Sequence, residues 1–142
     1  IMAELTSKKV QGDIYRLLKS SALAALISGE VYRSGMRPRD SRKEDAVVIF
    51  TSGLSEQVQS GVVTVNIFVP DCDGNGTGVL EENGKRCEEI EQAAASWVKS
   101  LTASRSCYKF SLGQTIYTET EPETNEHFVV VKLKYRYYDG EE

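Results

Sequence analysis

Two stretches of the sequence alternate apolar and polar residues with a period of two, and this pattern constrains the fold most. In residues 127–138 the apolar and aromatic positions are Val129, Val131, Leu133, Tyr135 and Tyr137, and the cationic positions between them are Lys132, Lys134 and Arg136. Residues 57–69 alternate in the same way. Successive side chains of a β-strand point to opposite faces, so each stretch predicts a strand with one face in a core and the other in water.

Three further segments have the composition of strands. Residues 46–51 are rich in β-branched side chains and predict a buried central strand. Residues 31–35 are short and predict an edge strand. Residues 107–119 are joined to 127–138 by a polar loop, which is typical of an antiparallel hairpin.

Apolar residues at three- and four-residue steps predict two helices, over residues 8–28 and 86–101. We expect Ser7 to be the N-cap of the first helix, and Gly29 to supply a left-handed residue at its end. The apolar face of the first helix consists of Val10, Ile14, Leu17, Leu18, Ala22, Ala25 and Leu26, and that of the second of Cys87, Ile90, Ala94, Trp97, Val98 and Leu101.

The predicted order is therefore α, β, β, β, α, β, β. Strands in runs with only two helices favour an α+β fold, with a mainly antiparallel mixed sheet of about five strands and both helices on one face. A chain of 142 residues is one domain's worth. Within this single domain (1–142), we expect residues 1–7 to be a flexible N-terminal segment and 139–142 an acidic tail.

Composition excludes several classes of protein. Apolar residues make up 40% of the chain, yet no apolar run approaches the roughly 20 residues that cross a bilayer, which disfavours membrane insertion. Nothing at the N-terminus has the pattern of a signal peptide, which disfavours secretion. Three cysteines without a close pair suit the reducing interior of a cell.

The charge is unevenly distributed along the chain. The net charge is −4, but residues 33–43 hold five cations and one anion. Acidic clusters lie at 81–91, 119–126 and 139–142. Such runs are often only solvated loops, and patches of opposite sign can also attract a charged partner or another copy of the chain. We interpret the basic run as a protein contact, and its candidate interface residues are Arg33, Arg37, Arg39, Arg42 and Lys43.

Residues 71–82 match a twelve-residue calcium loop through Asp71, Asp73, Asn75, Gly76 and Glu82. Carboxylate and amide oxygens at alternate positions can replace the hydration shell of a hard cation. A strand and a proline precede this loop, however, where a calcium-binding hand has a helix. Loops rich in Asp, Asn and Gly also arise from turn chemistry alone.

Residues that could serve catalysis or bind a cofactor have plainer explanations. His127 is the single histidine and stands at the start of a predicted strand, as an edge residue. Cys72, Cys87 and Cys107 lack the close spacing of structural zinc ligands, and the glycines in 74–78 lack the spacing of a dinucleotide loop. We therefore expect no enzymatic activity, no cofactor, and no catalytic or metal-binding residue.

Four segments carry a family resemblance. They are the end of the first helix ISGEVYRSGMRP, the strand pair EDAVVIFTSGLSEQVQSGVVTVNIFVPD, the helix RCEEIEQAAASWVKSL, and the closing strand KLKYRYY. In their order and pattern they resemble the small tail-terminator and tail-completion proteins, or minor tail proteins, of long-tailed bacteriophages and prophages. The resemblance implies a sheet with its helices on one side and no catalytic residues. It also implies a structural role in virion assembly, as a hexameric ring that caps the tail tube and joins it toward the head.

The resemblance also implies the partners and the location. We expect contacts with copies of the chain, with tail-tube and head–tail connector proteins, and not with a membrane. The protein would assemble in the bacterial host cytoplasm and reside in the virion tail. A ring is a closed heterologous assembly, and residues 33–43 could steer its contacts toward residues 81–91 or 119–126. Alternatively, the arginines could line a channel and contact passing DNA without reading its sequence.

A competing function follows from the residues alone. The chain could be a monomeric α+β module that binds calcium or another small ligand through residues 71–82. Light scattering with and without a chelator separates the two hypotheses, because only the calcium module should respond to the chelator.

Overall fold

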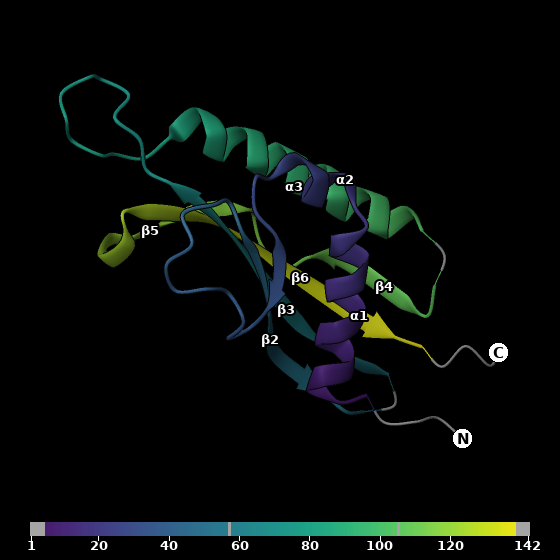
Figure 1. Cartoon of the computed structure of the whole chain (residues 1–142). Helices are drawn as coiled ribbons and strands as arrows, with labels where there is room; N and C mark the ends of the chain where they lie inside the picture. The colour runs from purple at the N-terminus through teal and green to yellow at the C-terminus, as the bar shows by residue number, and fades with distance from the viewer. Residues whose placement is uncertain (1–4, 57, 105, 139–142) are drawn as a thin grey trace.

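The computed structural model describes residues 5–56, 58–104 and 106–138 (Figure 1). The elements are α1 (Ser7–Lys19), α2 (Ala22–Leu26), β1 (Val31–Arg33), β2 (Ala46–Leu54), β3 (Gln59–Pro70), α3 (Gly84–Ala103), β4 (Tyr108–Leu112), β5 (Tyr117–Glu121), a 3₁₀ turn η1 (Pro122–Thr124), and β6 (Glu126–Tyr137). The α+β prediction is confirmed. The described part of the chain has six strands and three α-helices instead of about five strands and two helices.

The two strands with a period of two form the centre of the sheet. β3 and β6 pair antiparallel over their whole length, from Gln59 opposite Tyr137 to Pro70 opposite Glu126. β2 lies antiparallel to the other edge of β3, and β1 pairs parallel with β2. The sheet is therefore mixed and mainly antiparallel, in the order β1, β2, β3, β6, β4.

The strand predicted over 107–119 is two strands. β4 pairs with the end of β6, from Tyr108 opposite Tyr137, and β5 pairs with its beginning, from Tyr117 opposite Val130. Between them Gly113 donates its N–H to the carbonyl of Lys132 at 2.7 Å, and the chain leaves the ladder until β5. The predicted antiparallel pairing is correct, but the single strand is wrong.

The single helix predicted over 8–28 is also wrong. α1 ends at Lys19, and Ser21 begins α2, because its hydroxyl donates to the carbonyl of Leu18 and accepts from the N–H of Ala24. The N-cap of α1 is Thr6, whose hydroxyl accepts from the N–H of Lys9, and not Ser7.

Gly29 is required for a reason other than the predicted one. Among the described residues the glycines with positive φ are Gly35, Gly76 and Gly78, so Gly29 is not left-handed. A Cβ at Gly29 would lie 2.0 Å from Oδ1 of Asp45. Close packing against Asp45 excludes any side chain at this position.

The core lies between the helices and one face of the sheet. Buried residues of α1, α2 and α3 form one apolar cluster with alternate residues of the central strands. The strand residues in this cluster include Val63, Val65, Ile67, Val69, Val129, Val131, Leu133 and Tyr135. The other face of the sheet carries the intervening residues of β3 and β6, and no described helix covers it. We call it the open face.

Most of the two terminal segments lies outside the residues that the structure describes. The expected N-terminal segment 1–7 includes residues 1–4, which lie outside the described residues, as do the acidic tail 139–142 and residue 57. Leu5 packs against the core and donates its N–H to Oε1 of Gln59 at 2.8 Å. No described helix is both long and apolar enough to cross a membrane.

Candidate assembly surfaces

Arg37, one of the five predicted interface cations, is bound within its own chain. Its Nε lies 2.8 Å from Oδ2 of Asp45, and its Nη2 lies 2.9 Å from Oε1 of Glu126. The guanidinium carbon stands 4.1 Å from the centre of the Phe68 ring, on the open face. Asp45 is 1% exposed and Glu126 is 3% exposed, so both carboxylates are buried. Arg37 therefore ties the loop between β1 and β2 to the beginning of β6.

The electrostatics of this cluster favour charged carboxylates. Burial alone would raise the pKa of Asp45, but hydrogen bonds from Arg37, Ser41 and the N–H of Glu30 outweigh it and hold the pKa below its ordinary value. The cluster is a structural ion-pair network.

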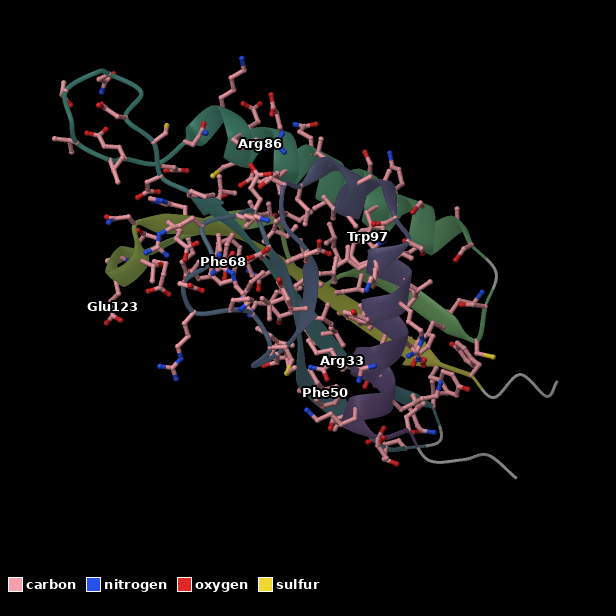
Figure 2. All side chains as sticks on the ribbon, viewed as in Figure 1. Arg33, Phe50, Phe68, Arg86, Trp97 and Glu123 are labelled. Carbon is pink, nitrogen blue, oxygen red and sulfur yellow. The ribbon has the colours of Figure 1, made fainter. Side chains whose placement is uncertain are left out.

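Arg33 also contacts its own chain. Its guanidinium carbon lies 5.3 Å from the centre of the Tyr15 ring in α1, beside Gly12 (Figure 2). Among the five cations, Arg39, Arg42 and Lys43 are exposed. The structure therefore divides the predicted residues into two that pack internally and three that face solvent, and their role in an interface stays a prediction.

A second group of cations lies on the open face, where β4 pairs with β6. Lys132, Lys134 and Arg136 alternate along β6, and Lys109 lies directly opposite Arg136. Within the described ranges, none of these four forms an ion pair. We call Lys109, Lys132, Lys134 and Arg136 the basic patch. The sequence indicated the polar face of β6, but Lys109 joins it only through strand pairing.

The basic patch borders a hollow of about 540 Å³. In the register of the sheet, Leu54 of β2 faces Ser60 of β3, which faces Arg136, and Val62 faces Lys134. Leu54 is 62% exposed. The hollow therefore combines apolar side chains with two cations.

Two glycines, Gly53 and Gly61, line this hollow. Gly53 and Gly61 lie opposite each other in β2 and β3. A Cβ at Gly61 would stand 2.1 Å from the carbonyl oxygen of Ser52 and 2.7 Å from the Tyr135 hydroxyl. No larger residue fits while the two strands keep this separation.

Residues 71–82, which we call the arm, project beyond β3 and the beginning of α3 (Figure 1). Cys72 and Glu81 exchange two backbone hydrogen bonds of 2.9 Å, which close the base of the loop. Farther out, the Asp73 carboxylate accepts from the N–H groups of Thr77 and Gly78. The Asp73 oxygens thus hold the loop in shape, as in turns that bind no ion.

Two large apolar residues lie exposed on the arm. Val79 is 55% exposed and Leu80 is 50% exposed. The core cluster and the residues packed against it include neither of them. The arm is therefore ordered by its own hydrogen bonds while its apolar side chains face outward.

His127 fixes the arm to the sheet. Its Nδ1 lies 2.7 Å from Oδ1 of Asp71, and its Nε2 lies 3.8 Å from Oε1 of Glu82. The N–H of Asp71 also donates to the carbonyl of Asn125 at 3.0 Å. The sequence placed His127 at the start of a strand, but its contact with Asp71, 56 residues away, follows only from the β3–β6 pairing.

Cys87 is unsuited to nucleophilic chemistry at neutral pH. Burial, followed by the negative charges of Glu82, Glu91 and Asp71, raises the pKa of its thiol to about 11. The nucleophilic form of cysteine is the thiolate, which is scarce four pH units below that value. Among the described residues, no three His, Cys, Asp or Glu side chains are arranged to hold a metal ion.

Comparison with known proteins bears on the fold alone. The sequence matches no family model and no curated protein. Several chains of solved structures match, and one of them has a TM-score of 0.55 at 14% sequence identity. The match covers 98% of this chain and 100% of that chain. Nearly the whole chain therefore has a fold that is similar to that of a solved protein.

Proposed function

We propose that this chain is a structural protein whose identical copies assemble into a closed ring. The observation that carries this proposal is the arm, on which Val79 and Leu80 face solvent although the loop beneath them is ordered. Exposed apolar groups on an ordered projection are typical of surfaces that contact another protein. The arm projects at one end of the sheet, so a contact between it and a different surface of the next copy is heterologous, and such contacts close into rings when the rotation permits.

The tail role rests on the sequence resemblance. The first of the four segments that resemble tail-terminator proteins follows α2 and contains β1. The other three fall in β2 and β3, in α3, and in β6. On this basis the ring would be a hexamer that caps a phage tail tube, contacts the head–tail connector, and lets DNA pass without reading its sequence. It would assemble in the host cytoplasm and remain in the virion tail. The function requires no reaction, because each copy supplies only shape and charge.

Sedimentation velocity across a range of concentrations tests the ring. We expect a concentration-dependent species of six times the 15.8 kDa chain mass, and rings in negative-stain electron micrographs. A monomer at every concentration up to the millimolar range would contradict the ring. Antibodies against the chain should label the head-proximal end of tails in phage particles from the same source, and labelling elsewhere would contradict the tail role.

The calcium hypothesis is tested in the same samples. Its motif uses Asp71 and Asp73, which contact His127 and the backbone of the loop itself. We expect sedimentation and thermal stability to be unchanged by a chelator. A monomer whose melting temperature rises with added calcium would favour the small-ligand module instead.

A further inference from the structure

The exposed apolar residues of the arm cannot reach the hollow of their own chain. The arm follows Pro70, at one end of β3, while the hollow is built around Gly61 near the other end. Nine residues of extended strand separate them, a span of about 30 Å. Figure 1 shows the arm and the β2–β3 turn at opposite ends of the sheet. Contact between the two surfaces therefore requires two copies of the chain.

The two surfaces are complementary in charge. Residues 71–82 contain four carboxylates and no Lys or Arg, and three of the four, Asp73, Glu81 and Glu82, are exposed. The hollow is bordered by Lys134 and Arg136, which have no ion-pair partner within the described ranges. Opposed charges of this kind orient two proteins as they meet and disfavour other pairings.

The two surfaces are also complementary in their apolar residues. Val79 and Leu80 project from the arm, and Leu54 and Val62 line the hollow. Burial of these residues against one another would supply affinity, while the charges around them supply register.

We infer that the arm of one copy docks in the hollow of the next, with Val79 and Leu80 against Leu54 and Val62, and the arm carboxylates beside Lys134 and Arg136. This inference rests on the proposed ring and names the two surfaces that form its contact. Because the surfaces differ, each copy keeps one of each kind free until the ring closes.

Two double variants test the contact. Val79→Ser with Leu80→Ser removes the apolar surface of the arm, and Lys134→Glu with Arg136→Glu reverses the charge beside the hollow. We expect each to weaken self-association by about 100-fold in sedimentation equilibrium, because each removes central interface groups. Lys19→Glu with Lys99→Glu is the control, since it makes the same charge change on exposed residues of α1 and α3, outside both surfaces. This control should leave the dissociation constant of self-association within about 3-fold of the wild-type value at physiological salt.

Mixing the two impaired proteins gives the sharper result. The arm variant keeps an intact hollow and the hollow variant keeps an intact arm, so the mixture has one competent contact. We expect a heterodimer and no ring. A mixture that stays monomeric, although circular dichroism and urea unfolding show both variants folded, would overturn the inference.

Other outcomes separate this inference from the proposed function. Rings that persist in both variants would overturn the arm contact and leave the ring intact. Loss of association in the Lys134 and Arg136 variant alone would assign the hollow another occupant, such as the acidic residues 139–142, and would also overturn it. A wild-type chain that never associates would contradict the proposed function itself.

Discussion

Replacement of Arg37 by alanine provides the strongest test of the folded structure. The sequence predicts Arg37 to be an interface residue, but in the structure its guanidinium pairs with both Asp45 and Glu126 and covers the Phe68 ring. The substitution would leave two buried carboxylates without a cation. If Arg37 served mainly a partner, the isolated chain would lose little stability.

The expected cost follows from the burial of the two carboxylates. Removal of one partner from a buried ion pair costs about 3–5 kcal/mol, because a charge remains in the interior without compensation. We expect a cost at the lower end of this range, because other hydrogen bonds to the two carboxylates remain. Ser41 and the N–H of Glu30 still donate to Asp45, and Thr124 still donates to Glu126. We expect the free energy of unfolding to fall by about 3 kcal/mol, a large part of the total for a domain of this size.

Urea unfolding followed by the fluorescence of Trp97, the only tryptophan, measures this loss. Arg39→Ala is the matched control, because Arg39 is exposed in the same loop. Its substitution should change the free energy of unfolding by no more than about 0.5 kcal/mol. A loss below about 1 kcal/mol for Arg37→Ala at an unchanged m-value would refute the reasoning.

The same variant has a predicted pH dependence. In the wild type the pKa of Asp45 is lowered, so its stabilising contribution is present above the unfolded value of about 3.9 and is lost as the pH falls through the folded value. Without Arg37, burial of Asp45 opposes its ionisation, and the carboxyl takes up a proton at higher pH. The difference between the two proteins should therefore be largest near neutral pH and shrink in acid. A difference independent of pH would contradict the ion-pair explanation.

Three further predictions concern other parts of the fold. Gly29→Ala should cost about 1–3 kcal/mol in urea unfolding, because its Cβ would meet Asp45 and the Glu44 carbonyl, whereas Gly84→Ala, with open space around it, should be neutral or slightly stabilising. Alkylation of Cys87 in the folded protein, followed by mass spectrometry, should accelerate as the pH rises through about 11, and a profile centred near 8.5 would contradict its burial. Asp73→Ala should leave the unfolding free energy nearly unchanged but increase hydrogen exchange at Thr77 and Gly78, and unchanged exchange there would show that the carboxylate does not order the arm.

The regular elements could be predicted from the sequence because their cause is local. The period of two located β3 and β6 to within two residues, and the apolar spacing located α3. The break between α1 and α2 could not be predicted in this way, because Ser20 and Ser21 do not interrupt the apolar spacing and the break depends on hydroxyl hydrogen bonds. The split of the strand at Gly113 likewise depends on its pairing with β6.

The candidate surfaces could be predicted only in part, because their residues are brought together by strand pairing. Arg37 and Glu126 are 89 positions apart, and no local pattern shows that they form an ion pair. Lys109 enters the basic patch because it lies opposite Arg136 in the register of β4 and β6. Charge along the chain identified one basic run, whereas the fold neutralises part of that run and creates a second group of cations on the open face.

The arm shows why a sequence motif and a structural role can share the same residues. Asp73 and Gly76 fit a calcium loop, but a rigid projection needs them for a different reason. The carboxylate of Asp73 accepts from the N–H groups of the turn, and Gly76 and Gly78 adopt the positive φ that the turn requires. An arm that is ordered before it meets a partner loses less conformational entropy on docking, so more of the energy from burying Val79 and Leu80 remains as affinity. In the proposed assembly, the hydrogen bonds that order the arm therefore have a role that requires no bound ion.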